Sequence, residues 1–431
     1  MIFKDLNKNE RKIFIIHLIY SIIEGTILGV LVLNEFVFIK SLSGSDFQIG
    51  LLFQFSMIVF IFAVLVHEII KRFKKQTILR VSALITRLPL LLFIFFPADA
   101  MNRGYLVYYH TGFLLVFQCF YLSTPVVFPI INSILKNNYR DKYFGSLYSY
   151  ATTSNKVAML AATYFFGVWL DFDNFAFVYV YPLMGVIGII SLFLLSKGVK
   201  VSYLGGSEKT GSLLDSVKNS VLNMRYIVKT NKPYRDFELG FMLYGFAFML
   251  TIAVISIFMA KELGLNYTSI AFYKNSYNII AIAALPVFGK LMDKMDPRKF
   301  GIISFSALML YLLFMALTEY FPYYADWGIY RFYWLLIISF AFNGLFAGSM
   351  PLLWNIGSAY FCSTEEAAEY QSVHLTFVGL RGIAAPLFGV GLYQYIGFTG
   401  VFGLGIFFLA LAMYVMYWSM KRKKLIRAVR D

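Results

Sequence analysis

Cysteine, histidine and charged residues are scarce in this 431-residue chain. The two cysteines, Cys119 and Cys362, lie far apart in apolar segments, so we expect no disulfide. The four histidines lack the spacing of zinc ligands, which predicts no metal site, and no cofactor is expected. Charged residues make up 14% of the chain, against about 25% in soluble domains. The composition therefore excludes an ordinary soluble protein.

Two functional motifs are also missing. The chain has no G-x-x-x-x-G-K-[ST] loop, so ATP is not expected to be the direct energy source. It has no paired carboxylates and no His/Asp cluster near a membrane interface, which a membrane-embedded transferase acting on lipid-linked substrates would need. The formal charge of +15 does not predict nucleic-acid binding, because the basic residues punctuate apolar runs and form no single surface.

Long apolar runs dominate the sequence, and hydrophobic residues make up 59% of it. About 20 apolar residues span a bilayer, which predicts an all-α membrane protein with about twelve transmembrane helices. They cover residues 13–39, 47–70, 77–96, 106–135, 144–170, 176–195, 237–259, 268–291, 300–316, 332–360, 369–396 and 400–420.

One polar linker divides these helices into two sets of six. We expect an N-terminal half over residues 1–196, a linker over 197–235 and a C-terminal half over 236–431. Apolar residues recur at helical spacing inside the linker and predict an amphipathic helix on the membrane surface. These residues are Leu214, Val217, Val221, Met224 and Val228.

The basic residues predict the orientation of the chain. Of its 38 Lys and Arg, 29 fall in alternate loops and at the two ends, which places both termini in the cytoplasm. The first apolar run is longer than a signal-peptide core and lacks a cleavage site, so the first helix is expected to remain. A multi-pass protein of a bacterial inner membrane is predicted.

The two halves look like repeats of one another. Sliding the sequence by about 221 to 226 residues superposes helix on helix and loop on loop, and residues 143–172 then run parallel to 370–398. Two six-helix halves of this kind are typical of secondary transporters, which bind their substrate near the midplane between the repeats.

The turn between the eighth and ninth predicted helices carries the pattern G-x-x-x-D-K-x-x-x-R-K, formed around Gly289, Asp293, Arg298 and Lys299. This pattern resembles the signature loop of the major facilitator superfamily of secondary transporters. The resemblance implies a conformational role for the loop, a fold of two six-helix halves, and transport by alternating access.

A second resemblance lies in the eleventh predicted helix. Gly382, Pro386 and Gly389 are similar to the Gly/Pro-rich motif that the superfamily uses at the interface between halves. The fifth predicted helix lacks this proline, which weakens the alternative of a drug exporter. The first-half counterpart of the signature loop, residues 67–75, lacks the glycine and the aspartate, so the subfamily is not assigned.

Ionisable residues inside a bilayer cost at least about 2.5 to 3.5 kcal/mol and usually face a partner or a pathway. Five stand out here: Glu24, Arg87, Lys156, Lys274 and Arg381. Glu24, one turn after Tyr20, is interpreted as a proton-binding carboxylate or as half of a fixed salt bridge. For Arg87, a structural partner or a water-filled crevice is expected rather than substrate contact.

The cations of the fifth and eleventh helices suit an anionic substrate. Lys156 has Asn155 beside it, and Arg381 has His374 two turns earlier on the same side. Arginine offers a planar bidentate clamp and lysine a point charge. The alternative for each is a structural ion pair. Lys274, near Asn278 on the eighth helix, is a cavity cation or a residue that snorkels to the headgroups.

These observations predict a secondary active transporter of a small organic solute, with a lean towards anions or zwitterions and with a proton as the possible coupling ion. We expect a monomer whose partners are the solute and the lipid bilayer. The alternatives are a lipid or lysolipid flippase or a drug exporter of the same fold, and, from a different class, the membrane-embedded transferase.

Overall fold

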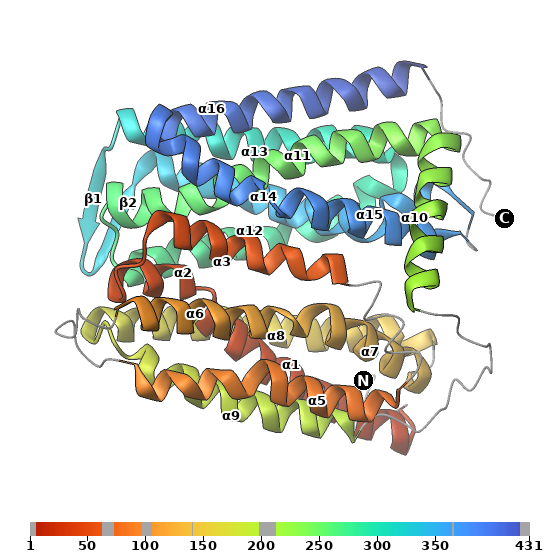
Figure 1. Cartoon of the computed structure of the whole chain (residues 1–431), viewed down its shortest axis with the longest axis horizontal. Helices are drawn as coiled ribbons and strands as arrows, with labels where there is room; N and C mark the ends of the chain where they lie inside the picture. Colours follow the sequence, from red (N-terminus) through yellow and green to blue (C-terminus); the bar gives the residue numbers. More distant parts are fainter. Residues whose placement is uncertain are drawn as a thin grey trace. The chain divides into compact units, whose positions relative to one another are not determined.

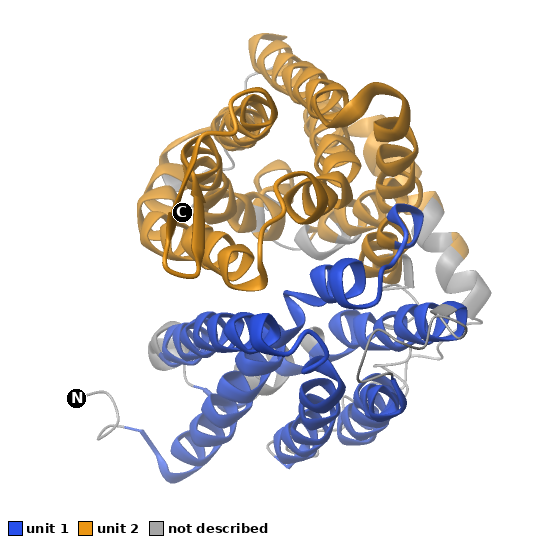
Figure 2. Ribbon diagram, turned by 90° about the vertical axis from the view of Figure 1, so that its left-hand side faces the viewer, with its two compact units in different colours: residues 1–48, 62–210 blue, residues 49–61, 211–431 orange. Residues whose placement is uncertain are grey.

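The computed structural model describes residues 6–62, 73–96, 106–139, 141–197, 213–363 and 366–422. The chain forms two compact units, which Figure 2 colours separately. Unit 1 holds Met1–Gln48 and Phe62–Thr210, and unit 2 holds Ile49–Ile61 and Gly211–Asp431.

Unit 1 is built from helices. A capping box of Asn7 and Glu10 starts the first helix. At the C-terminal end of α5 the chain continues as a tighter helix that begins at Leu88 and has Pro89 as its second residue. The elements are α1 (Lys8–Leu31), α2 (Asn34–Phe36), η2 (Val37–Ser41), α5 (Lys75–Arg87), η4 (Leu88–Phe95), α6 (Leu106–Tyr121), α7 (Ser123–Asn138), α8 (Asp141–Phe172) and α9 (Phe177–Ser196).

Unit 2 contains most of α3 (Asp46–Ile58) and η3 (Val59–Phe62), together with the C-terminal half of the chain. Its further elements are α10 (Leu213–Thr230), α11 (Lys232–Ile257), η6 (Phe258–Glu262), α12 (Tyr267–Lys294), α13 (Pro297–Tyr320), β1 (Tyr324–Trp327), β2 (Tyr330–Tyr333), α14 (Trp334–Ile356), η7 (Ser358–Phe361), α15 (Ala367–Gly382) and α16 (Ala385–Arg422). The helix predicted in the linker is α10, which lies across one end of the unit while β1 and β2 lie at the other (Figure 1).

Eight described helical segments are long and apolar enough to cross a membrane, and each overlaps a predicted span. Two local differences stand out. The tenth predicted span begins two residues too early, because Phe332 and Tyr333 belong to β2. The eleventh is broken after Gly382, and α16 begins at Ala385 with Pro386 as its second residue, where a missing N–H is tolerated.

Glycines let the long helices touch backbone to backbone within each unit. In unit 1, a Cβ at Gly25 or Gly29 of α1 would collide with the carbonyls of Asn155 and Met159 on α8. In unit 2, a Cβ at Gly389 of α16 would collide with the Leu250 carbonyl of α11. Small residues are the usual means of close helix contact inside a bilayer.

Replacing Gly389 by alanine is expected to push α16 away from α11. Overpacking of this kind typically costs about 1 to 3 kcal/mol, so Gly389→Ala should lower the midpoint of thermal unfolding. Gly403, in the part of α16 that follows the kink at Gly397, has open space around its Cβ position, and Gly403→Ala should leave the midpoint unchanged or raise it. Equal destabilisation by the two substitutions would contradict the close contact.

A two-stranded hairpin closes one end of unit 2. Antiparallel β1 and β2 pair Tyr324 with Tyr333 and Asp326 with Arg331, and the turn contains Gly328 at a φ of 61°. Arg331 Nε donates to Asp326 Oδ1 at 3.0 Å, and this carboxylate raises the pKa of the Arg331 side chain above its ordinary value. The hairpin thus has its own cross-strand ion pair.

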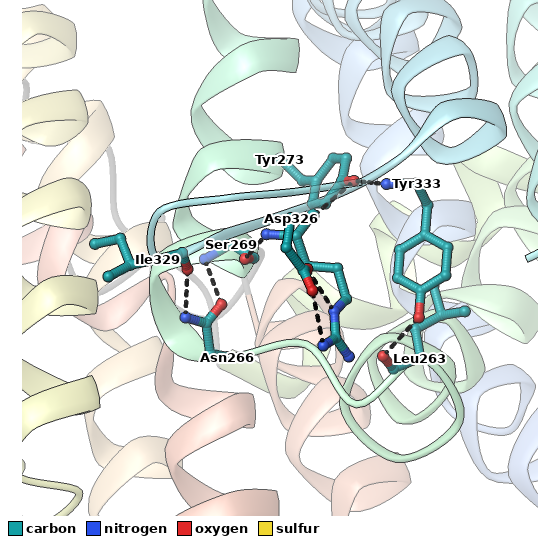
Figure 3. A network of polar contacts seen from close by, with 8 residues as sticks. Leu263, Asn266, Ser269, Tyr273, Asp326, Ile329 and Tyr333 are labelled. Atoms are coloured by element: carbon teal, nitrogen blue, oxygen red, sulfur yellow. Dashed lines mark hydrogen bonds and ion pairs between the residues drawn. The ribbon is translucent and has the colours of Figure 1, made fainter. Parts of the chain in front are cut away.

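Hydrogen bonds tie the hairpin to α12 and to Leu263, the C-cap of η6 (Figure 3). The buried hydroxyl of Tyr273 accepts from Tyr333 N at 2.8 Å and donates to Arg331 O at 3.2 Å. Asn266, the N-cap of α12, donates to Ile329 O at 2.8 Å, and the Tyr333 hydroxyl donates to Leu263 O at 3.1 Å.

Tyr273→Phe is expected to loosen this attachment. The substitution leaves the buried Tyr333 N–H without its partner, which costs about 1 to 3 kcal/mol, so trypsin should cleave faster after Arg331. Tyr277→Phe, one turn along α12, is the matched control and should cleave at the wild-type rate. Identical cleavage of Tyr273→Phe and wild type would contradict the role of this hydroxyl.

Candidate functional site

Arg381 is a buried cation of unit 2 that contacts several aromatic rings. It lies in the last turn of α15, where the helix dipole favours a positive charge, and its side chain is 5% exposed. Its Nη1 donates to the backbone oxygen of Phe241 at 2.7 Å. The guanidinium carbon lies 5.5, 5.2 and 5.7 Å from the ring centres of Phe241, Tyr244 and Trp354. Three rings therefore stabilise and orient one cation.

Gly245 provides the space for this guanidinium. A Cβ on Gly245 would overlap the guanidinium atoms of Arg381, so no larger residue fits at this point of α11 while Arg381 keeps its position. The site is thus specified by two helices at once, α15 through the cation and α11 through the missing side chain.

The Nε and Nη2 of Arg381 are buried and have no hydrogen-bond partner among the described residues. These two donors form one edge of the guanidinium, and such an edge matches the two oxygens of a carboxylate. Buried donors without partners cost free energy comparable to a lost hydrogen bond. The edge therefore presents the two parallel donors that bidentate recognition of an anion requires.

A second polar pair lies beside this cation. His374 Nδ1 is 2.9 Å from Glu238 Oε1 and 3.1 Å from Oε2, and the two side chains are 1% and 4% exposed. The His374 ring packs edge-on against Phe241 and Trp354, which also contact Arg381. The predicted proximity of His374 and Arg381 thus takes the form of shared aromatic neighbours.

The central feature of unit 1 is an ion pair between α1 and α5. Arg87 Nη2 donates to Glu24 Oε1 at 2.6 Å, with Arg87 1% exposed. The Arg87 guanidinium carbon also lies 4.2 Å from the Phe120 ring centre. Burial of the cation with its counter-charge gives Arg87 the structural partner that its sequence position predicts.

The remaining candidate residues lie on the first, fifth and eighth predicted helices. Asn155 donates to Ser21 O at 2.8 Å and so joins α8 to α1, while Lys156 beside it is half-buried. Tyr20 is 7% exposed on α1. On α12, Asn278 donates to Lys274 O at 2.8 Å, within its own helix.

The signature loop contains a buried charge network. Arg298 is fully buried and donates from Nε and Nη2 to the two oxygens of Asp296, at 3.0 and 2.8 Å. Asp296 also caps the N-terminus of α13, and Arg298 Nη1 reaches Ser419 Oγ of α16 at 2.9 Å. The loop thereby fastens the start of α13 to the end of α16.

The remaining residues of the signature loop and of the Gly/Pro-rich motif range from exposed to buried. Gly289 has open space around its Cβ position and Lys299 is exposed, while the side chain of Asp293 lies outside the described part of the chain. A Cβ on Gly382 would press against Met57 of α3. Pro386 is buried beside the break between α15 and α16.

Sequence reasoning missed Glu238 and Phe241. Glu238 is the second residue of the seventh predicted span, so the sequence places it at the end of a helix and not among the buried charges. In the structure α11 begins at Lys232, six residues before Glu238, and Glu238 therefore lies inside the helix. An acidic residue so near the start of an apolar run was the available signal. Phe241 contributes through its carbonyl and its ring, and no sequence pattern reveals either contact.

The described site and fold agree with one large family of membrane proteins. The family model of the Major Facilitator Superfamily matches residues 13–330 and 237–429. The chain therefore belongs to the major facilitator superfamily. It is an integral multi-pass membrane protein and a secondary transporter that works by alternating access. The family consists of transporters, which sets aside the transferase alternative.

Solved structures of transporters share this fold over nearly the whole chain. The nucleoside transporter NupG is 13% identical, with a TM-score of 0.64, and the match covers 97% of this chain and 100% of that one. A bacterial homologue of the human lysosomal transporter Spinster, inward-facing and unoccupied, is 16% identical with a TM-score of 0.65, covering 99% and 100%.

The inward-open xylose transporter XylE from E. coli is 14% identical with a TM-score of 0.65, and the match covers 97% of each chain. A comparison with curated protein sequences finds no significant match. At these identities the likeness shows the fold, and the substrate has to be inferred from the site itself.

The Glu24–Arg87 pair can be tested by a double-mutant cycle. Glu24→Gln leaves Arg87 buried without its counter-charge, which is expected to cost about 3 kcal/mol and to lower the thermal midpoint. Glu24→Gln combined with Arg87→Met removes both charges and should recover most of that loss. Additive losses in the double variant would contradict a direct pairing.

Proposed function

We propose that this transporter carries a small organic anion with a carboxylate group and that Arg381 binds the carboxylate. The observation that carries the proposal is the unpartnered Nε and Nη2 edge of a guanidinium whose Nη1 is already held by Phe241 O. A cation fixed in this way is preorganised, so little conformational entropy is lost when an anion binds.

The surroundings support an organic anion of modest size. Phe241, Tyr244 and Trp354 contact the guanidinium, and such aromatic surfaces favour the apolar part of a ligand that carries a few well-placed polar groups. Direct contact of Lys156, in unit 1, with the same solute stays a prediction.

The membrane and the orientation follow from the charge asymmetry alone. We keep the proposals that both termini face the cytoplasm and that the protein lies in a bacterial inner membrane, because basic residues collect in alternate loops. The end of unit 2 that carries β1 and β2 then faces outward, and the end that carries α10 faces the cytoplasm.

Thermal-shift screening of the purified protein tests the substrate class. Sodium benzoate, sodium L-lactate and disodium succinate are the carboxylate probes, while D-xylose, uridine and choline are the neutral and cationic ones. A ligand that binds the folded state raises the midpoint by mass action. At least one carboxylate is expected to raise it, and the neutral and cationic probes are not.

Three variants assign the effect to the Arg381 edge. Arg381→Ala should weaken carboxylate binding about 10²-fold, which corresponds to about 3 kcal/mol for charge-assisted hydrogen bonds. Arg381→Lys keeps the charge without the bidentate edge and should bind at least about tenfold more weakly than wild type. Gly245→Ala keeps every charge and should also weaken binding, because it displaces the guanidinium.

The control variant is Arg225→Ala, which removes a positive charge from an exposed position on α10 of the same unit. It should bind carboxylates like the wild type. Carboxylate binding that survives unchanged in Arg381→Ala, or stabilisation by the neutral and cationic probes alone, would overturn the proposal.

A further inference from the structure

Glu238 and His374 form a buried pair that takes no direct part in the proposed binding of a carboxylate by Arg381. Both Glu238 oxygens lie within 3.1 Å of His374 Nδ1, and His374 Nε2 is buried without a partner among the described residues. Histidine is the side chain that ordinarily titrates near neutral pH. The pair can therefore exchange a proton where an Arg–carboxylate pair cannot.

The pair is electrostatically connected to Arg381. His374 and Arg381 both contact the rings of Phe241 and Trp354, and the charge of Glu238 acts on the Arg381 guanidinium. Because all three side chains are almost fully buried, screening of these charges by solvent is weak.

The tyrosine and cysteine side chains around the pair are neutral near pH 7. The Tyr234 hydroxyl, near Glu238, donates to Tyr370 O at 2.7 Å, and Tyr244 lies against Arg381. Cys362 is close to Tyr234, and burial raises the pKa of its thiol to about 11. Glu366 acts on Cys362 and is bound to Ser363, so the charges at the site are those of Glu238, His374 and Arg381.

Charge balance then links anion binding to a proton. As long as the edge is empty and His374 carries no added proton, the charge of Arg381 offsets that of Glu238. A bound carboxylate adds a second negative charge, and the cluster would carry an uncompensated charge in a buried environment, which is costly. A proton on His374 restores neutrality.

We propose that His374, held by Glu238, takes up one proton when a carboxylate binds Arg381, so that the transporter carries a proton together with its anionic solute. This inference rests on the proposed function, because it needs an anion at Arg381. It also locates the proton at α11 and α15 of unit 2 and departs from the sequence hypothesis of coupling through Glu24.

Glu24 is less suited to carry the coupled proton, because it is paired with Arg87. A proton on Glu24 would leave Arg87, which is 1% exposed, as a buried cation with its counter-charge lost. Removing one partner from a buried pair in this way is strongly unfavourable. At the Glu238–His374 pair the proton instead adds the charge that the bound anion requires.

Isothermal titration calorimetry on the full-length protein in nanodiscs tests the inference with sodium benzoate, sodium L-lactate and disodium succinate as probes. Titrations in phosphate and in Tris, whose ionisation enthalpies differ, give the number of protons taken up per bound anion. Wild type should take up close to one proton per monocarboxylate. Because protons are gained on binding, affinity should fall as pH rises, by up to about tenfold per pH unit.

Two substitutions separate coupling from binding. His374→Gln keeps an amide donor for Glu238 but cannot titrate, so it should bind benzoate without proton uptake and without pH dependence between pH 6 and 8. Glu238→Gln removes the negative charge that the proton offsets, so it should also bind without proton uptake. Its affinity at pH 8 should exceed that of wild type. His17→Gln, in unit 1, is the control and should keep the wild-type proton uptake.

The outcomes distinguish this inference from the proposed function. Carboxylate binding by wild type without proton uptake overturns the inference and leaves the proposed function standing. Proton uptake that persists in both His374→Gln and Glu238→Gln also overturns it. Failure of all three carboxylates to bind wild type overturns the proposed function and the inference with it.

Discussion

A permanent cation buried in an apolar interior needs a counter-charge or a full set of hydrogen-bond acceptors, and this requirement organises both units. Arg87 meets it with Glu24, and Arg298 meets it with Asp296 and Ser419. Arg381 is held by one carbonyl and three rings, and the charge of Glu238 acts on it without a direct ion pair among the described residues. Arg87 also has two donors without a partner, but its counter-charge lies at 2.6 Å, and this difference in counter-charge distinguishes Arg381.

Close helix contact makes this arrangement of charges possible. Glycines at the α1–α8 and α11–α16 contacts bring backbones together, and Gly245 leaves the volume that the Arg381 guanidinium occupies. The hairpin of β1 and β2 fixes the opposite end of unit 2 through Tyr273 and Asn266. At Arg381 itself, the Phe241 carbonyl and the space at Gly245 keep the guanidinium edge in one orientation, which a preorganised binding site requires.

The sequence predicted the helical architecture and the family because apolar runs of membrane-spanning length and the signature loop are local patterns. It also singled out Arg381 and His374, since ionisable residues are rare in such runs. It did not predict the pairing of His374 with Glu238, which are 136 residues apart. It also missed the break between α15 and α16, because the apolar composition continues through that break. It missed the hairpin as well, because aromatic residues make up much of its two strands.

Binding of the carboxylate at Arg381 can be seen directly in a structure of the protein in nanodiscs with bound benzoate, determined by electron cryo-microscopy. Density for the carboxylate is expected within hydrogen-bond distance, about 3 Å, of Arg381 Nε and Nη2, with Nη1 still on Phe241 O. A protein carboxylate filling that edge while benzoate is bound elsewhere would contradict this expectation, and Arg381 would then be a structural cation like Arg87.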